Sequence, residues 1–234
     1  WVRAHRARAL NPDHPVMRGT AQNPDTYFQS RESVNPFYEA VPARVQQCME
    51  SLGKLTGRHY RLVEYHGAPD ATDVIVLMGS GAATARTTVD WLNRQDRKTG
   101  VLVVRLYRPF PVQALLDALP KGVRRIAVLD RTKEPGAGGE PLLLDVQSAL
   151  IDGLQRGLIK RLPWLSGGRY GLSSKEFTPA MCAAVFEELS SDAPRPRFTV
   201  GIVDDVSGLS LVWHPIGDLE PASRVRALFF GLGA

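Results

Sequence analysis

The chain has 234 residues, a net charge of +5 and an apolar fraction of 44%, values typical of a globular protein with a sizeable core. It contains no apolar run near the roughly 20 residues of a membrane-spanning helix, so we expect no membrane partner. Its basic residues are not interleaved with stacking aromatics and form no nucleic-acid motif, so we expect no nucleic-acid partner either.

The two cysteines, Cys48 and Cys182, are too few to supply the four thiolates of an iron–sulfur cluster. No zinc-ligand spacing occurs, so no metal site is predicted. Both cysteines fall in predicted helices far apart in sequence, and we expect buried, small apolar side chains in preference to a disulfide or a redox pair.

The first 40 residues are predicted to be irregular, because three Asn-Pro pairs interrupt them and each pair favours a turn or an extended step. Tyr27, Phe28, Phe37 and Tyr38 are nevertheless too many aromatic residues for a disordered tail. This irregular N-terminal segment should therefore lie ordered over another surface.

A helix is predicted over 42–55, where Pro42 suits the first turn and Thr56-Gly57 ends the pattern. Its apolar residues fall on one face, as in a helix that packs against a core. A short strand is predicted over 58–66, and we place a domain boundary near 58–70.

The centre of the chain has the pattern of a βαβ unit. An apolar run over 74–78 leads through Gly79-Ser80-Gly81 into an amphipathic helix over 82–97, and a second apolar run covers 101–106. Continuous apolar runs on either side of a helix indicate two buried parallel strands with a right-handed crossover.

Strands and helices keep alternating towards the C-terminus. In chain order we predict helix 112–119, strand 125–129, helix 141–155, a strand within 161–174, helix 178–190, strand 198–203 and a last strand over 225–230. This alternation defines an α/β domain with a mostly parallel sheet and flanking helices. The chain starts without Met and its last strand leads into no helix, so we interpret it as an internal piece of a longer protein with a truncated C-terminal strand.

The carboxyl edge of the sheet is the expected functional edge, because ligands of open α/β sheets bind there. Three loops should meet at this edge, over 79–82, 105–111 and 130–139. Gly79-Ser80-Gly81 is either a tight structural turn or an anion cradle at a helix N-terminus. The complete G-x-G-x-x-G fingerprint of dinucleotide-binding proteins is absent.

Arg105, Arg108 and Arg131 should form a basic rim at that edge. They can recognise a carboxylate or a phosphate, or they can pair with Asp130, Glu134 or carboxylates of another domain, which we favour. The charged loop that begins at Asp130 is likewise interpreted as a domain contact. No histidine stands beside a nucleophile in a recognised motif, so no catalytic residue is predicted.

Several sequence runs together resemble one family. They are 10–12 (LNP) with 14–15 (HP), 18–25 (RGTAQNPD), 67–71 (GAPDA), 106–110 (LYRPF), 129–137 (LDRTKEPGA), 168–172 (GRYGL) and 231–234 (GLGA). Over essentially the whole chain, this set resembles the long single-chain form of pyruvate:ferredoxin (flavodoxin) oxidoreductase.

The resemblance implies an oxidative decarboxylation in which pyruvate and coenzyme A become acetyl-CoA and carbon dioxide. Ferredoxin or flavodoxin would accept the electrons. The intact enzyme would hold thiamine diphosphate, Mg²⁺ and [4Fe–4S] clusters, with none of these cofactors bound within this chain. The resemblance further implies a cytoplasmic homodimer, in which the other domains of the same protein are the partners of this chain.

The resemblance also implies a placement of domains. Residues 1–57 would end the pyrimidine-side thiamine-diphosphate domain, and 58–215 would form a second core domain similar to the transketolase C-terminal domain. Residues 224–234 would begin a gamma-type domain. The fragment would then be a structural core segment without a complete active site.

Candidate site residues follow from this placement. Gly231, Gly233 and Ala234 resemble the start of a loop associated with coenzyme A, and we expect them at the edge of that site. A contact surface near the cofactor domains is hypothesised from four residues: Arg105, Arg108, Asp130 and Arg131. The alternatives are a freestanding α/β binding or assembly module without catalysis, and a self-sufficient nucleotide-binding enzyme, which the incomplete glycine fingerprint disfavours.

Overall fold

A computed structural model describes residues 1–9, 11–13, 19, 21–204, 206–217, 219, 223, 225, 227–228 and 230–231. The chain divides into two compact units, Trp1–Val41 and Pro42–Ala234. Among the described residues, none of the helices combines the length and the apolar character that a bilayer crossing demands.

The first unit is helical where the sequence predicts irregular structure. Its described residues form three short helices, α1 (Val2–Ala7), α2 (Pro24–Glu32) and α3 (Asn35–Glu39). The prediction is wrong because an Asn-Pro pair also starts a helix: Pro24 stands at the first position of α2, where its fixed φ and missing N–H are tolerated. None of these three helices has a buried residue among those described.

Helix α4 (Val41–Thr56) confirms the helix predicted over 42–55. Cys48 is exposed on α4, so the prediction that it is buried is wrong. Cys182, on α8 (Pro179–Ser190), is buried as predicted. Burial raises the pKa of the Cys182 thiol to about 12, so this side chain is a protonated, apolar core group at neutral pH.

The described residues of the second unit form one six-stranded sheet. Its strands are β1 (Val63–Gly67), β2 (Asp73–Leu77), β3 (Thr99–Val104), β4 (Arg125–Asp130), β5 (Trp164–Arg169) and β6 (Arg197–Thr199). Their order is β1-β3-β2-β4-β5-β6, in which β1 runs antiparallel to β3 and all other pairs are parallel. The predicted α/β class with a mostly parallel sheet is confirmed.

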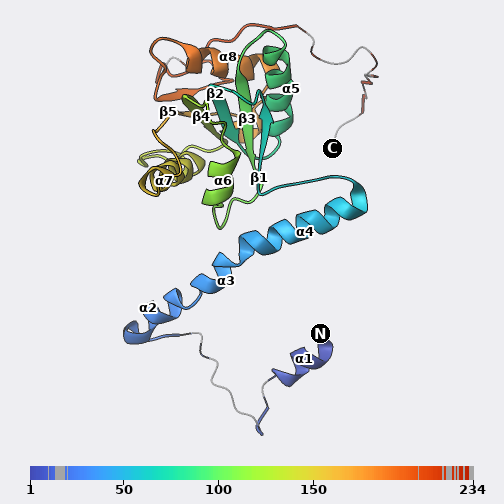
Figure 1. Cartoon of the computed structure of the whole chain (residues 1–234), viewed down its shortest axis with the longest axis vertical. Coiled ribbons are helices and arrows are strands. Elements are labelled where there is room, and N and C mark those ends of the chain that lie inside the picture. The colour runs from blue at the N-terminus through green and yellow to red at the C-terminus, as the bar shows by residue number, and fades with distance from the viewer. Residues whose placement is uncertain are drawn as a thin grey trace. The chain divides into compact units, whose positions relative to one another are not determined.

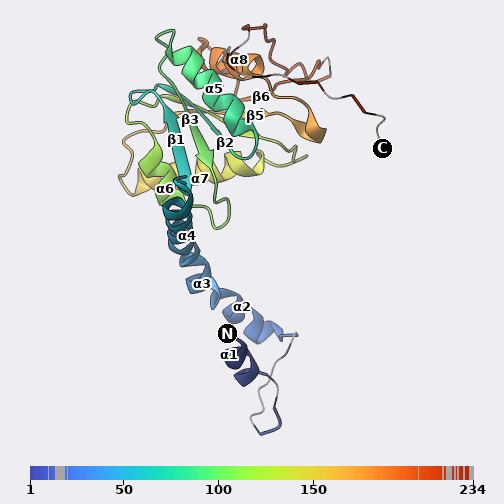
Figure 2. The same cartoon turned by 90° about the vertical axis from the view of Figure 1, so that its right-hand side faces the viewer.

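Helices cover both faces of the sheet, as the two cartoon views show for this unit (Figures 1 and 2). The remaining α-helices among the described residues are α5 (Gly81–Asn93), α6 (Val112–Ala118) and α7 (Pro141–Gln155), and a short 3-10 helix, η1 (Leu172–Ser174), follows β5. α5 and α8 share one apolar cluster with Ile75 and Leu77, whereas α6 and α7 share another with Val74 and Val76. Because successive strand side chains point to opposite faces, β2 alone supplies both clusters, and all four of these residues are fully buried.

The strand order places a topological switch point between β2 and β4. From β2 the chain first moves outwards to β3, then crosses back over β2 to reach β4, β5 and β6. In open α/β sheets a crevice forms at the carboxyl ends of the two strands where this reversal occurs. The loops that begin at Met78 and at Arg131 therefore border the expected ligand edge.

The last predicted strand, over 225–230, is not formed by the residues that the structure describes there. After β6, the described residues add one isolated β-bridge to the sheet, in which Ser210 pairs in parallel with Thr199 of β6. The predicted strand over 198–203 is confirmed in part, since β6 ends at Thr199.

Candidate functional site at the carboxyl edge of the sheet

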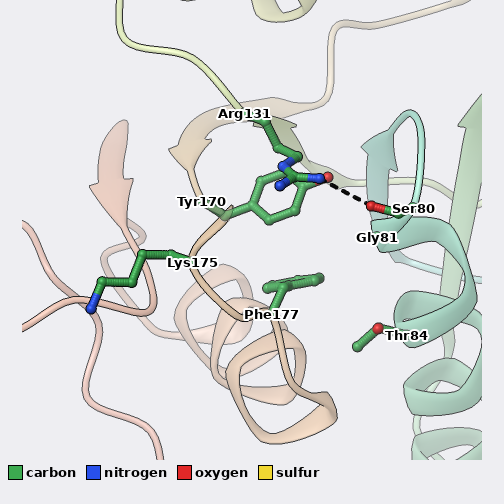
Figure 3. Close-up of a pocket in the computed structure, with 7 residues that line it drawn as sticks. All are labelled: Ser80, Gly81, Thr84, Arg131, Tyr170, Lys175 and Phe177. Atoms are coloured by element: carbon green, nitrogen blue, oxygen red, sulfur yellow. Dashed lines mark hydrogen bonds between the residues drawn. The ribbon is translucent and has the colours of Figure 1, made fainter. Parts of the chain in front are cut away.

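A small cavity lies at the switch point between β2 and β4 (Figure 3). Ser80 and Gly81, at the start of α5, line it together with Arg131 after β4 and Tyr170 after β5. Its volume is about 130 Å³, which suits water or a small inorganic anion. No carboxylate side chain of the described residues lines it, so its polar groups are hydroxyls and cations.

Arg131 connects the loops on either side of this cavity. Its Nη1 donates to Ser80 Oγ at 3.0 Å, and its Nε and Nη2 donate to the Gly171 carbonyl at 3.2 and 3.0 Å. The guanidinium carbon lies 5.9 Å from the Tyr170 ring centroid. These bonds use three of the five N–H groups of the guanidinium and leave two for an anion. The predicted meeting of the 79–82 and 130–139 loops is thus found.

Asp130, the neighbour of Arg131, faces the opposite layer of the sheet. Its carboxylate accepts hydrogen bonds from the backbone N–H groups of Leu142 at 2.9 Å and Leu143 at 3.2 Å, in the first turn of α7. The side chain satisfies helix donors that would otherwise be orphaned, and it fixes α7 against β4. Burial raises the pKa of Asp130 above its ordinary value, although the two backbone hydrogen bonds act in the other direction.

The raised pKa of Asp130 predicts a pH-dependent contribution to stability. Because the folded state binds this proton more tightly than the unfolded state, the contribution is greatest below the unfolded pKa and declines as pH rises through the folded one. The quantity to compare is the unfolding free energy of the parent minus that of Asp130→Asn. We expect this difference to fall as pH is raised from about 3.5 to about 7. Urea unfolding at several pH values measures this difference, and a rise over the same window would contradict the assignment.

Arg108 follows β3 and is anchored to α7. Its Nη1 donates to Asp145 Oδ2 at 2.7 Å, and its guanidinium carbon lies 4.0 Å from the Tyr107 ring centroid. Burial raises the pKa of Tyr107, and the negative charges of Asp145 and Asp130 act in the same direction. The 105–111 loop therefore meets the end of β4 on the face that α6 and α7 cover.

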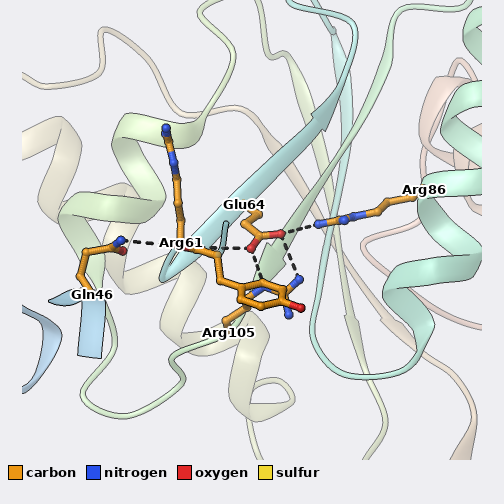
Figure 4. Close-up of polar contacts among 6 residues, drawn as sticks. Gln46, Arg61, Glu64, Arg86 and Arg105 are labelled. Carbon is orange, nitrogen blue, oxygen red and sulfur yellow. Dashed lines mark hydrogen bonds and ion pairs between the residues drawn. The ribbon is translucent and has the colours of Figure 1, made fainter. Parts of the chain in front are cut away.

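Arg105 lies beyond the end of β3 and pairs with β1 (Figure 4). Its Nε and Nη2 bind the two oxygens of Glu64 at 2.6 and 3.0 Å, and Arg86 of α5 adds a bond of 2.5 Å to the same carboxylate. Burial would raise the pKa of Glu64, but the bonds from Arg105 and Arg86 outweigh it and hold that pKa below its ordinary value. Glu64 therefore stays ionised and fixes the antiparallel edge strand.

Among the described residues, no three His, Cys, Asp or Glu side chains gather as metal ligands would. The polar groups at the switch point are chiefly hydrogen-bond donors, which suit anion binding and contacts with carboxylates. The geometry at this edge therefore suits the binding of an anionic group.

Two family models match different parts of the chain. Residues 71–170 match pyruvate:ferredoxin oxidoreductase core domain II, which includes β2, β3, β4 and β5. Residues 1–50 match the thiamine-diphosphate-binding model of pyruvate flavodoxin/ferredoxin oxidoreductase.

Curated relatives match the chain from end to end. The chain is 58% identical over 233 residues to the pyruvate-flavodoxin oxidoreductase of Trichormus variabilis, with all of this chain and 19% of the relative covered. It is 58% identical over 237 residues to that of Rhodospirillum rubrum, covering 20% of it, and 53% identical over 233 residues to the pyruvate:ferredoxin oxidoreductase of Moorella thermoacetica, covering 19%. Over its whole length, this chain matches a segment of the pyruvate:ferredoxin (flavodoxin) oxidoreductases. It spans about a fifth of the length of these relatives.

All four predicted contact residues lie in the segment that matches core domain II. Arg105 and Arg108 pair with Glu64 and Asp145, so the pairing with Asp130 or Glu134 that we considered is not formed. The carboxylates come from β1 and α7, which sequence reasoning did not bring to this edge. Whether these residues touch other domains stays a prediction.

Four residues that line the cavity at the switch point were not predicted from the sequence: Thr84, Tyr170, Lys175 and Phe177. The signal for Tyr170 is its place directly after β5, where side chains reach the same carboxyl edge. Gly231 is described and exposed, and the predicted coenzyme A residues Gly233 and Ala234 lie outside the described residues.

Proposed function

We propose that this chain is a structural core segment of a larger oxidoreductase that decarboxylates pyruvate oxidatively and transfers the acetyl group to coenzyme A. The observation that carries the proposal is the 58% identity to a pyruvate-flavodoxin oxidoreductase over 233 residues. In this reaction the C1–C2 bond of pyruvate breaks, carbon dioxide leaves, and the acetyl carbon forms a thioester with the coenzyme A sulfur. The two electrons released pass to ferredoxin or flavodoxin.

Thiamine diphosphate would supply the carbanion chemistry of this reaction when bound in the intact protein. The described residues of this chain do not fit an iron–sulfur cluster, because Cys48 is exposed on α4 and Cys182 is buried within α8. We therefore propose that Mg²⁺ and [4Fe–4S] clusters are held elsewhere in the intact enzyme, and we assign no catalytic step to this chain.

The proposed task of this chain is to position the domains around it. We propose that 1–57 end the thiamine-diphosphate domain, that 58–215 are core domain II and that 224–234 begin a gamma-type domain containing the edge of a coenzyme A loop. The matches over 1–50 and 71–170 support the first two assignments. We further propose a cytoplasmic homodimer, which light scattering of the intact protein would test.

The activity is tested on the intact protein that contains this chain. We expect reduction of ferredoxin or flavodoxin, followed by absorbance, that requires both pyruvate and coenzyme A. An intact protein loaded with its cofactors that reduces neither acceptor would contradict the proposed reaction and favour a binding or assembly module.

The proposed contact surface predicts a second outcome in the intact protein. Replacing both Arg108 and Arg131 by alanine should lower activity at least tenfold or weaken subunit assembly, because each substitution removes a cation from the carboxyl edge. A tenfold loss corresponds to about 1.4 kcal/mol. Arg156→Ala is the matched control, since this exposed arginine pairs only within α7 and with Gln113 among the described residues. Unchanged activity and assembly in the double variant would remove the contact role.

A further inference from the structure

We propose that a second cavity at the carboxyl edge binds a small organic phosphate with a flat apolar body, a class represented by nucleoside monophosphates. The cavity has a volume of about 420 Å³, within the range of small-molecule sites. It is lined by Lys133 after β4, by Arg169 and Leu172 around the end of β5, and by Thr199 at the end of β6. This site is independent of the reaction proposed above.

One wall of this cavity is apolar and partly open to solvent. Leu172, Val200, Ile202 and Val206 line it. Val200 is buried, but Ile202 is 42% exposed and Val206 is 94% exposed. A flat apolar body placed here would cover side chains that water now contacts, which is the main source of affinity in small-molecule sites.

The cavity is also lined by three cations, Lys133, Arg169 and Lys175. Arg169 donates to Glu140 at 3.4 Å, and Lys133 Nζ lies 4.0 Å from the same carboxylate. The Lys175 amine has no hydrogen-bond or ion-pair partner among the described residues, and Figure 3 shows it extending away from Arg131 and Ser80. Because Arg169 and Lys133 share one buried carboxylate and Lys175 has none among the described residues, the three cations leave positive charge that suits a phosphate group.

The carboxylate of Asp204 also lines the cavity. Its oxygens are already hydrogen-bonded to residues of its own loop. Its oxygens accept from the backbone N–H groups of Val206 and Ser207, both at 3.0 Å, and from the Ser207 hydroxyl. These hydrogen bonds lower the pKa of Asp204 to about 2, so its charge offsets part of the positive charge of the two lysines and the arginine. Counting Glu140 as well, three cations face two carboxylates, which leaves a net positive charge at the cavity.

Thr199 supplies the observation that points most directly to a missing partner. Its side-chain hydroxyl is buried and makes no hydrogen bond with any described residue. The residue as a whole is only 8% exposed. Buried hydroxyls are normally paired, and an unmade bond destabilises the folded state. A phosphate oxygen or a ligand hydroxyl in this cavity would supply the partner.

The probe for this proposal is AMP, titrated into the 234-residue chain by calorimetry and by thermal unfolding. AMP should bind and raise Tm, because a ligand that binds only the folded state stabilises it. Inorganic phosphate carries the head group alone and adenosine carries the body alone. Each should bind at least tenfold more weakly than AMP.

Two variants test the assigned residues. Lys175→Ala should weaken AMP binding about tenfold, whereas Lys160→Ala should not, because Lys160 is also exposed but lies outside the cavity. Thr199→Val is close in shape and removes the unpaired hydroxyl. It should keep or raise the Tm of the free chain and weaken AMP binding about three- to tenfold, as expected for one hydrogen bond.

Three results would overturn the proposal. The first is the absence of AMP binding to a chain that unfolds cooperatively. The second is an equal loss of affinity in Lys175→Ala and Lys160→Ala, which would indicate unspecific attraction to a basic surface. The third is inorganic phosphate binding as tightly as AMP, which would show that the apolar wall contributes nothing.

Discussion

Replacing Phe186 by alanine lowers the unfolding free energy of the second unit by about 3–5 kcal/mol, the largest effect that we expect from a single substitution. Phe186 is fully buried on α8, in the cluster that joins α5 and α8 to the sheet. Truncation removes the transfer free energy of the ring and leaves a cavity that the packed strands cannot close. Because a domain of this size has only about 5–15 kcal/mol of stability, the variant should unfold at much lower urea concentration.

The matched control is Phe37→Ala, since Phe37 is 76% exposed in the first unit. This substitution should change the unfolding free energy by no more than about 0.5 kcal/mol. Equal urea midpoints for the two variants would contradict the buried position of Phe186. The denaturant slope should stay constant across the series, so that midpoints can be compared directly.

Gly168→Ala is expected to destabilise the chain by about 1–3 kcal/mol, although it adds only one methyl group. Gly168 lies on β5, and a Cβ atom there would stand 2.6 Å from Leu129 Cδ2 and closer still to the Phe198 ring. Both neighbours are buried, so neither can move into solvent. The absent side chain is what allows the Phe198 ring to approach β5 this closely.

A double-mutant cycle separates this steric clash from any loss of stability that replacing a glycine causes by itself. Phe198→Leu removes part of the ring that the new methyl group meets, so Gly168→Ala should cost less in the Phe198→Leu background than in the parent. Gly138→Ala is the control, because a Cβ atom at Gly138 would meet nothing within 4 Å. Strictly additive free energies would exclude the close approach as the cause.

The buried parallel strands were predictable because their apolar runs are continuous and their connecting helices carry a 3.6-residue pattern. β2, β3 and β4 were located within about two residues on this basis. The direction of β1 was not predictable, since an edge strand with mixed composition gives no signal for parallel or antiparallel pairing. The N-terminal helices were missed because Asn-Pro was interpreted as a helix breaker, although the same pair serves equally well as a helix start.

The site was predictable as a place but not as a set of contacts. Strand ends in a parallel sheet must meet at one edge, and that rule alone brought Ser80 and Arg131 together. The partners of Arg105 and Arg108 were missed because Glu64 and Asp145 belong to other elements, and pairing across elements depends on the strand order. Asp145 could have been found from its place in the second turn of α7, which begins at the same edge.

Asp130 and Arg131 are consecutive residues that serve opposite layers of the protein. The carboxylate holds the first turn of α7, and the guanidinium holds the loops around α5 and β5. Inserting or deleting one residue in β4 would exchange the two sides, presenting a cation to the N–H groups of α7 and a carboxylate to Ser80. We therefore expect the length of β4 to be conserved among related chains, because a change of length would misplace both side chains at once.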